Sequence, residues 1–356
     1  MPDAPDASPA PAPAPDRAHA DRGTAYHRMA TLREPWSAWS KPLLTVFAAF
    51  ASYVIMASAL LVTVVLLLAL VPGVNVALGV TSGDPASPLD VGLALAMGAL
   101  WLPAGLIGVR AGGWRPIGTA FSVAAHLRSV LATPAALAVI AGGVITVAVA
   151  ALAGSLAPME AGPAVPGPSI GAVLALVLVT AVLAPLQVAG LELTMRGLVM
   201  QALGTWLRSP VLPILAVMGI ALIGREWSAA VLIPALTLAA CAGILAWKSG
   251  GLELPFLLTL TTTVVGILTS GFAVGTGIGS GAAAMVAASA APGSSNAALA
   301  GGAPASAALA GGIAGAIALV VVTAVACVLI GRRDGLTLAE PVTRAADEPL
   351  PPIVAV

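Results

Sequence analysis

Residues 43–71 read LLTVFAAFASYVIMASALLVTVVLLLALV, a stretch without a single charged side chain. A helix needs about 20 consecutive apolar residues to cross the hydrocarbon core of a bilayer, so this stretch is long enough to span it. Similar runs recur along the 356 residues, which are 59% hydrophobic and only 8% charged, whereas soluble domains carry about 25% charged residues. The sequence therefore predicts an all-α, polytopic membrane protein in contact with the lipid bilayer, and it offers no support for a nucleic-acid partner.

The apolar runs and the charged residues between them predict about eight transmembrane helices. The predicted spans are about 43–71, 91–109, 129–153, 169–190, 210–224, 228–247, 253–270 and 309–330. Cytoplasmic loops carry an excess of Lys and Arg, and this excess sets the orientation of the chain. A cytoplasmic N-terminus places fourteen of the fifteen Lys and Arg residues inside and leaves only Arg225 outside. Both termini are therefore predicted to be cytoplasmic.

The basic residues predicted to be cytoplasmic are Arg17, Arg22, Arg28, Arg33, Lys41, Arg110, Arg115, Arg128, Arg196, Arg208, Lys248, Arg332, Arg333 and Arg344. Only two of the fifteen basic residues are Lys, and the chain is rich in Gly and Pro. This usage indicates a GC-rich bacterial genome, so the predicted location is the bacterial plasma membrane.

The chain divides by composition into six predicted parts. Residues 1–40 form a Pro/Ala-rich tail with too few large apolar residues to fold, so the tail and its histidines, His19 and His27, are predicted to be disordered and solvated. The remaining parts are two spans with a basic loop (41–128), a compact membrane domain (129–270), a flexible Gly/Ala/Ser loop or re-entrant hairpin (271–308), the last span (309–333) and a C-terminal tail (334–356).

One segment carries charge at the edge of an apolar run. Residues 185–210 read PLQVAGLELTMRGLVMQALGTWLRSP, in which Glu192 and Arg196 lie four residues apart on one face of a helix. Acid before base at this spacing is the favourable order. An isolated charge at the bilayer centre costs about 2.5–3.5 kcal/mol on insertion scales, so the two charges need each other, a cavity or the interface. Either they line a polar pocket that opens to the cytoplasm, or Arg196 snorkels to the lipid headgroups.

This segment resembles motif 1 of the CPBP family, intramembrane metalloproteases related to CAAX prenyl proteases and to bacteriocin-processing, Abi-like proteins. That motif has two adjacent glutamates, an arginine four residues after the second, and then glycine. VLPILAVMGIALIG (211–224) resembles the helix with the Phe-x-x-x-His motif, and LAWKSGGLELPFLLTLTTTVVGIL (245–268) resembles the segment with Trp-x-x-Gly-Gly-Leu and His-x-x-x-Asn. GTAFSVAAHLRSV (118–130) is similar to the linker that precedes the catalytic unit in members of this family. The whole resemblance covers about 115–270.

The chain departs from this pattern at the residues that would do chemistry. The resemblance implies zinc as the cofactor, with Glu192 and Arg196 as the retained motif residues. The positions that would activate water or bind metal fall on four other residues: Leu191, Gly224, Thr259 and Thr263. A catalytic zinc site needs about three strong ligands and an open position, and the metal lowers the pKa of its bound water to about 7. We therefore expect no bound metal, no other cofactor and no intact catalytic set.

Other polar residues favour structural roles. The threonines 259, 261, 262 and 263 of one span are predicted mainly to pack, because membrane threonines bond their own helix or a neighbouring one. His126 is predicted to be an interfacial residue rather than a metal ligand, and Cys241 and Cys327 are predicted to be buried free thiols.

Three hypotheses of function follow. The favoured one is an inactive pseudoprotease that binds a membrane segment or a protein partner. The alternatives are an active CAAX-like membrane metalloendopeptidase with non-standard site residues, and a small membrane transporter.

Overall fold

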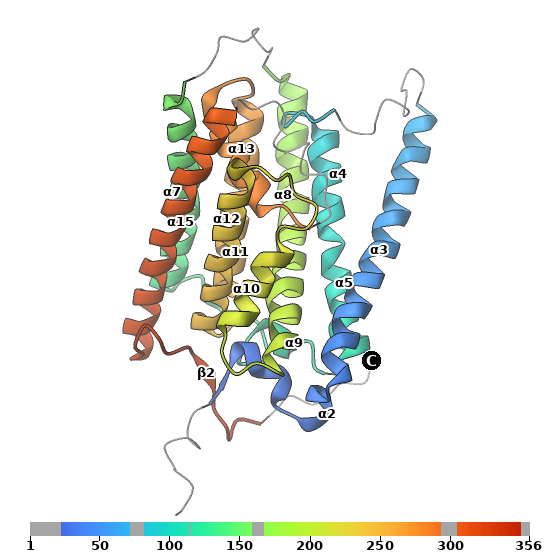
Figure 1. The fold of residues 1–356 in the computed structure, drawn as a ribbon. Coiled ribbons are helices and arrows are strands. Elements are labelled where there is room, and N and C mark those ends of the chain that lie inside the picture. Colours follow the sequence, from blue (N-terminus) through green and yellow to red (C-terminus); the bar gives the residue numbers. More distant parts are fainter. Residues whose placement is uncertain (1–22, 72–81, 114, 159–166, 293–304, 350–356) are drawn as a thin grey trace, which may run out of the picture.

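The computed structural model describes residues 23–71, 82–113, 115–158, 167–292 and 305–349, and these form a bundle of helices (Figure 1). Seven helical stretches among the described residues are long and apolar enough to cross a membrane: Ser40–Ala69, Pro88–Gly112, Pro134–Leu156, Ile170–Gly204, Ala229–Ser249, Glu253–Phe272 and Ala305–Asp334. The prediction of an all-α, multi-pass membrane protein is confirmed at this level. The predicted eight spans and the cytoplasmic location of the termini stay predictions.

Five of these stretches are single helices: α3 (Ser40–Ala69), α7 (Pro134–Leu156), α11 (Ala229–Ser249), α12 (Glu253–Phe272) and α15 (Ala305–Asp334). The second stretch joins α4 (Pro88–Ala99), α5 (Trp101–Ile107) and the π-helix η3 (Gly108–Gly112). The fourth joins α8 (Ile170–Glu192), the π-helix η4 (Leu193–Met200) and α9 (Gln201–Gly204). A short helix, α6 (Gly118–Phe121), lies in the loop after η3.

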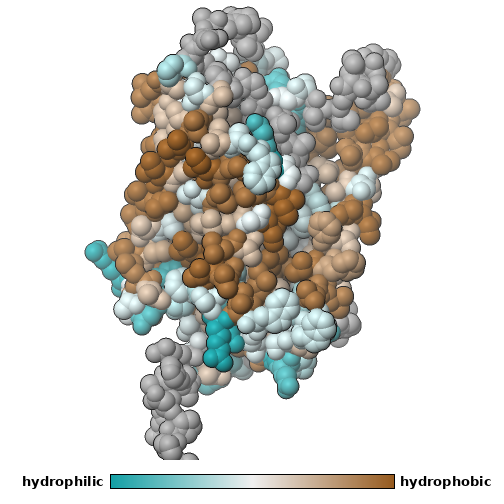
Figure 2. All heavy atoms as spheres, viewed as in Figure 1, coloured by the Kyte–Doolittle hydropathy of each residue, from teal (hydrophilic) through white to brown (hydrophobic). Residues whose placement is uncertain are grey.

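The outer face of the bundle is apolar, as contact with lipid requires. Helix α3 shows this most clearly, because only 11% of its most apolar 18-residue stretch is buried inside the protein. Apolar side chains cover the middle of the face shown in Figure 2, and hydrophilic ones gather mainly toward its lower end. At about 1.5 Å per residue, the 30-residue α3 is longer than the roughly 30 Å hydrocarbon core.

Small residues attach α3 to the rest of the bundle. Its buried residues Thr45, Ala49, Tyr53 and Ala57 recur every four residues and so form one stripe. Opposite this stripe, a Cβ on Gly112 would lie 2.2 Å from the Cα atom of Thr45, and a Cβ on Gly108 would also clash with α3. Two glycines four residues apart allow such close helix contact in membranes. The ring of Tyr53 stacks on Trp101 with centroids 3.9 Å apart.

Two short helices interrupt the regular bundle. The predicted span 210–224 is α10 (Val211–Ile220), whose ten residues cover about 15 Å and cannot cross a bilayer as a helix. Within the Gly/Ala/Ser segment 271–308, residues 277–289 form α13 (Gly277–Ser289), in which every residue except Ile278 is buried. This part is therefore a buried helix and not a flexible loop, whereas the re-entrant hairpin stays a prediction. The predictions for residues 293–304 lie outside the described residues.

The boundary of the N-terminal tail was predicted wrongly. Residues 24–37 form β1 (Thr24–Ala25), the 3₁₀-helix η1 (Tyr26–Thr31) and α2 (Glu34–Ser37). Tyr26 and Met29 are fully buried, and the Tyr26 hydroxyl donates to the carbonyl of Ala120 at 2.5 Å. His27 is buried rather than solvated, with Nε2 3.0 Å from the carbonyl oxygen of Arg208. The Pro/Ala bias ends near residue 22, and the aromatic residues after it supply apolar surface that docks. Residues 1–22, including His19, lie outside the described residues.

The C-terminal tail also folds onto the bundle. Its strand β2 (Thr343–Arg344) pairs antiparallel with β1, and both lie at the lower end of the molecule in Figure 1. The buried Arg344 guanidinium donates to the carbonyl of Val123 at 2.6 Å. The fully buried Lys248 ammonium donates to the carbonyls of Thr337 and Glu340, each at 2.5 Å. Basic side chains that find backbone carbonyls therefore hold residues 337–344, which were predicted to form part of a free tail.

Candidate functional site

The Glu192–Arg196 pair lies inside the bundle, where α8 passes into η4. Arg196 Nη1 is 3.3 Å from Glu192 Oε1, and the two side chains are only 4% and 1% exposed. Arg196 Nη2 also donates to the carbonyl of Ala239 on α11 at 3.3 Å. The predicted pairing is therefore confirmed. The snorkelling interpretation is wrong, because Arg196 is directed to a carboxylate and a carbonyl inside the protein.

Thr259 on α12 completes this group. Its hydroxyl donates to Glu192 Oε1 at 2.8 Å, so Oε1 receives both Arg196 and Thr259. The other three threonines follow the packing prediction, since each hydroxyl bonds a carbonyl three or four residues earlier in α12. Thr259 alone turns to another helix, and it links α12 to the charged pair on α8.

The structure brings only some of the motif positions together. Leu191, Arg196 and Thr259 line a small cavity of about 20 Å³, which has room for about one water molecule. Thr263 is buried, but its hydroxyl bonds the carbonyl of Thr259 within α12. Gly224 is exposed, in a turn with φ of 76°, and does not line the cavity. The motif positions therefore do not all converge on one site.

Sequence reasoning missed Arg225, which enters the small cavity from the turn after α10. Its guanidinium donates to the carbonyls of Ala288 at 3.0 Å and Ala290 at 2.8 Å, and also to those of Ala221 and Ala287. These carbonyls lie at the C-terminal ends of α10 and α13. The last carbonyls of a helix have no partner within it, and the negative end of the helix dipole favours a cation. Arg225 thus joins the ends of both short helices.

The exceptional position of Arg225 was the signal that could have identified it. It is the one basic residue that the orientation rule places outside. The structure buries its side chain, with 6% of the residue exposed. The positive-inside rule describes basic residues in loops, so it does not apply to a buried Arg that binds helix ends inside the protein.

The donor set around Glu192 does not fit zinc. Among the residues that the structure describes, no group of three or more His, Cys, Asp or Glu side chains lies close enough to hold a metal ion. Glu192 has a cationic guanidinium and a hydroxyl as neighbours, whereas a zinc site needs about three strong ligands. His126 is exposed, with Nδ1 2.9 Å from the carbonyl oxygen of Ala124. Cys241 and Cys327 are buried free thiols, as predicted.

A larger cavity of about 390 Å³ lies on the other side of Glu192. It is bounded by the loop at residues 121–131, by α8 and by α12, and its walls are mostly apolar. Buried Glu192 belongs to its wall, and Glu192 Oε2 has no hydrogen-bond partner. Ligand sites are typically apolar cavities of about 300–1,000 Å³ with a few polar groups, and this cavity has that character.

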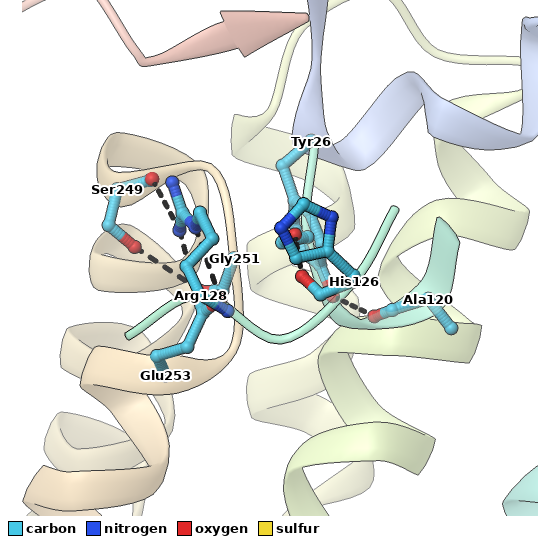
Figure 3. A network of polar contacts seen from close by, with 8 residues as sticks. Tyr26, Ala120, His126, Arg128, Ser249, Gly251 and Glu253 are labelled. Carbon is cyan, nitrogen blue, oxygen red and sulfur yellow. Dashed lines mark hydrogen bonds and ion pairs between the residues drawn. The ribbon is translucent and has the colours of Figure 1, made fainter. Parts of the chain in front are cut away.

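A second ion pair holds the rim of this cavity (Figure 3). Arg128 donates through Nε to Glu253 Oε1 at 3.1 Å and through Nη2 to Glu253 Oε2 at 2.9 Å. Its Nη2 also donates to the carbonyl of Ser249 at 2.9 Å. Figure 3 places Arg128 beside Ser249, Gly251 and Glu253, at the turn between α11 and α12. The loop is thereby tied to that turn.

Arg115 fixes the π-helix that carries Arg196. It is 3% exposed and donates through Nη2 to the carbonyl of Gly197 at 3.0 Å, and it also bonds the side-chain oxygen of Gln201. Burial lowers the pKa of Arg115 to about 10, so the guanidinium remains charged at neutral pH. π-Helical turns are rare in proteins, and those that occur often lie at functional sites. Arg115 satisfies a carbonyl within one of them, next to the candidate site.

The chain has no match among protein-family models, curated proteins or solved structures.

Proposed function

We propose that this protein is a catalytically inactive, CPBP-like integral membrane protein that binds a membrane segment or a protein partner. The observation that carries the proposal is the environment of Glu192. Its carboxylate is neutralised by Arg196 and bonded by Thr259, and within the described part of the chain no imidazole or second carboxylate bonds it. Such a carboxylate holds helices together and leaves no acid–base pair to activate water.

The chemistry of the neighbouring side chains supports this proposal. A general base works when its pKa is matched to the operating pH and it can reach the proton it removes. Thr259 and Thr263 are poor metal ligands, and Leu191 and Gly224 cannot ligate through their side chains at all. No Ser/His or Cys/His pair replaces them among the described residues: Cys241 and Cys327 are buried in apolar surroundings, and exposed His126 bonds a backbone carbonyl.

Metal content and peptide cleavage test the proposal together. We expect the purified protein to hold far less than one zinc per chain and to cleave no membrane peptide in a chelator-sensitive way. The control is Glu192→Ala, which should change neither result. One zinc per chain that is lost in Glu192→Ala, together with cleavage abolished by a chelator, would favour the active metalloendopeptidase instead.

One observation favours transport as a second candidate. Transporters often bind substrate where interrupted helices end inside the membrane, and α10 and α13 both end at the buried Arg225. Arg225 is a buried basic residue where these two helices end. Solute flux into proteoliposomes, measured against Arg225→Met, separates this candidate from a binding protein.

A further inference from the structure

The cavity beside Glu192 has an apolar wall that continues onto the surface of the protein. Its apolar lining includes Phe121, Leu127, Leu131, Ala189, Phe256 and Leu257. Leu127 and Leu131 are 63% and 61% exposed, so they extend the apolar wall outward from the cavity. Exposed apolar surface next to a cavity is where a membrane or an apolar ligand contacts a protein. The cavity therefore opens toward molecules already dissolved in the bilayer.

Glu192, in the wall of the cavity, has one unused hydrogen-bond acceptor. Glu192 Oε1 already receives Arg196 and Thr259, while Glu192 Oε2 is buried and has no partner. Leaving a buried charged acceptor unsatisfied is costly, so native proteins rarely do it. A ligand that brings one donor to Oε2 would remove this cost.

The charges around the cavity decide which donor fits. Glu192 is neutralised by Arg196, and Glu253 at the rim is neutralised by Arg128. An ammonium group would add an uncompensated positive charge to this buried region, and a carboxylate would repel Oε2. Burying an unpaired charge is far more costly than burying a hydrogen-bonded hydroxyl. The site therefore favours a neutral donor on an apolar body.

We propose that this cavity binds a neutral, membrane-dissolved alcohol, with its chain along the apolar wall and its hydroxyl donating to Glu192 Oε2. The proposal rests on the proposed function, because it leaves Glu192 free of metal. The ligand is a single-chain amphiphile whose volume suits a cavity of about 390 Å³. It enters sideways from the bilayer, past Leu127 and Leu131.

Photolabelling of the full-length protein in phosphatidylcholine vesicles tests this site. The probe is a long-chain alcohol with a diazirine in its chain, and mass spectrometry locates the label. We expect labelling within 127–131 or 252–257 and competition by the unlabelled alcohol. The amine and the carboxylic acid of equal chain length should compete about tenfold less well, because each brings an uncompensated charge to the buried site. Equal competition by either one, or labelling confined to other segments, would overturn the proposal.

Two matched variants on α8 sharpen the test. Ala189→Phe places a ring in the cavity and should abolish the competable labelling, whereas Ala181→Phe, exposed on the same helix and outside the cavity lining, should preserve it. Glu192→Gln keeps the shape but weakens the acceptor, so labelling should fall about tenfold. If Glu192→Gln does not fold, the two alanine variants decide the question. Equal labelling in both rejects the site.

Zinc content measured on the same preparation separates the two proposals. Failure of alcohol binding in a zinc-free, non-cleaving protein overturns only the ligand inference. Stoichiometric zinc with cleavage overturns the proposed function, and with it the free Glu192 that the ligand requires.

Discussion

The two ion pairs beside the cavity are built differently. Glu192 and Arg196 lie on one helix, are 1% and 4% exposed, and share a single 3.3 Å contact. Arg128 and Glu253 lie 125 residues apart and are 25% and 6% exposed, and both carboxylate oxygens accept from the guanidinium. In the Arg128–Glu253 pair, here called the rim pair, the guanidinium binds both carboxylate oxygens. The Glu192–Arg196 pair, here called the core pair, leaves Glu192 Oε2 and Arg196 Nε without partners. The better-buried pair is thus the less satisfied one.

This difference separates two uses of charge. A bidentate Arg–carboxylate pair joins two segments with defined geometry. A core pair with unused atoms contributes less to stability than its burial suggests, because desolvation offsets the attraction. Its unused atoms remain able to bind something else. The rim pair therefore joins two segments of the chain, whereas the core pair supplies a polar group to the cavity.

The largest expected effect comes from breaking the core pair. Glu192→Leu should destabilise the protein by about 3–5 kcal/mol, because it leaves Arg196 charged and buried without its partner. The double variant Glu192→Leu, Arg196→Met should recover most of that loss. Reversible unfolding in mixed micelles measures both. Arg333→Met, in an exposed pair with Asp334, is the control and should change stability by under about 1 kcal/mol. A double variant as unstable as the single one would contradict this account.

A smaller loss is expected at Arg225, whose guanidinium is bonded by backbone carbonyls. Arg225→Met should destabilise the protein by about 2–3 kcal/mol, since it leaves the carbonyls at the ends of α10 and α13 unsatisfied. Hydrogen exchange should rise in α13 before it rises in α7. Arg225→Lys retains a cation but has fewer donors, so its stability should lie between that of the wild type and that of Arg225→Met. An unchanged exchange rate in α13 would show that Arg225 does not hold these helix ends.

The rim pair should have a more modest effect. Arg128→Ala should cost about 1–2 kcal/mol, because Arg128 is partly exposed and water replaces some of its bonds. A double-mutant cycle with Glu253→Ala gives the coupling between the two side chains. A positive coupling is expected here, whereas the core pair should show rescue by apolar replacement. Rescue of the same kind at the rim would remove the distinction between the pairs.

The smallest effect concerns the N-terminal segment that packs at the lower end. Burial lowers the pKa of His27 from its usual 6.5, and the carbonyl of Arg208 opposes this in part. Because the undocked segment binds the proton more readily, docking is fully stable above about pH 6.5 and weakens as the pH falls below it. Hydrogen exchange of residues 24–31 between pH 7.5 and 5.5 should show this loss. His27→Gln should make the exchange independent of pH once intrinsic rates are corrected.

Several features were accessible from the sequence because they depend on local patterns. The apolar runs placed α11 and α12 to within two residues at each end, since length and hydropathy alone determine which segments suit a bilayer. The spacing of Glu192 and Arg196 predicted their pairing, because side chains four apart meet on any helix. The threonine contacts within α12 followed in the same way.

Other features depend on which segments meet. The apolar run 210–224 did not reveal that its helix stops at Ile220, because Arg225 at that end is satisfied by α13, 62 residues away. The docking of Tyr26 depends on the carbonyl of Ala120, a partner that no local pattern announces. The unused oxygen of Glu192 was likewise invisible, since it results from what Thr259 and Arg196 leave unfilled.

By itself, the sequence determined that this chain is a membrane-embedded helical bundle with an acid–base pair on one helix, because hydropathy and helical periodicity act over neighbouring residues. Only the tertiary structure decided that the pair is buried, that Arg225 joins two short helices, and that an apolar cavity ends at a carboxylate with a free acceptor. Those features arise where distant segments pack together. In such places each polar group finds a partner, or fails to find one, according to the shape of its neighbours.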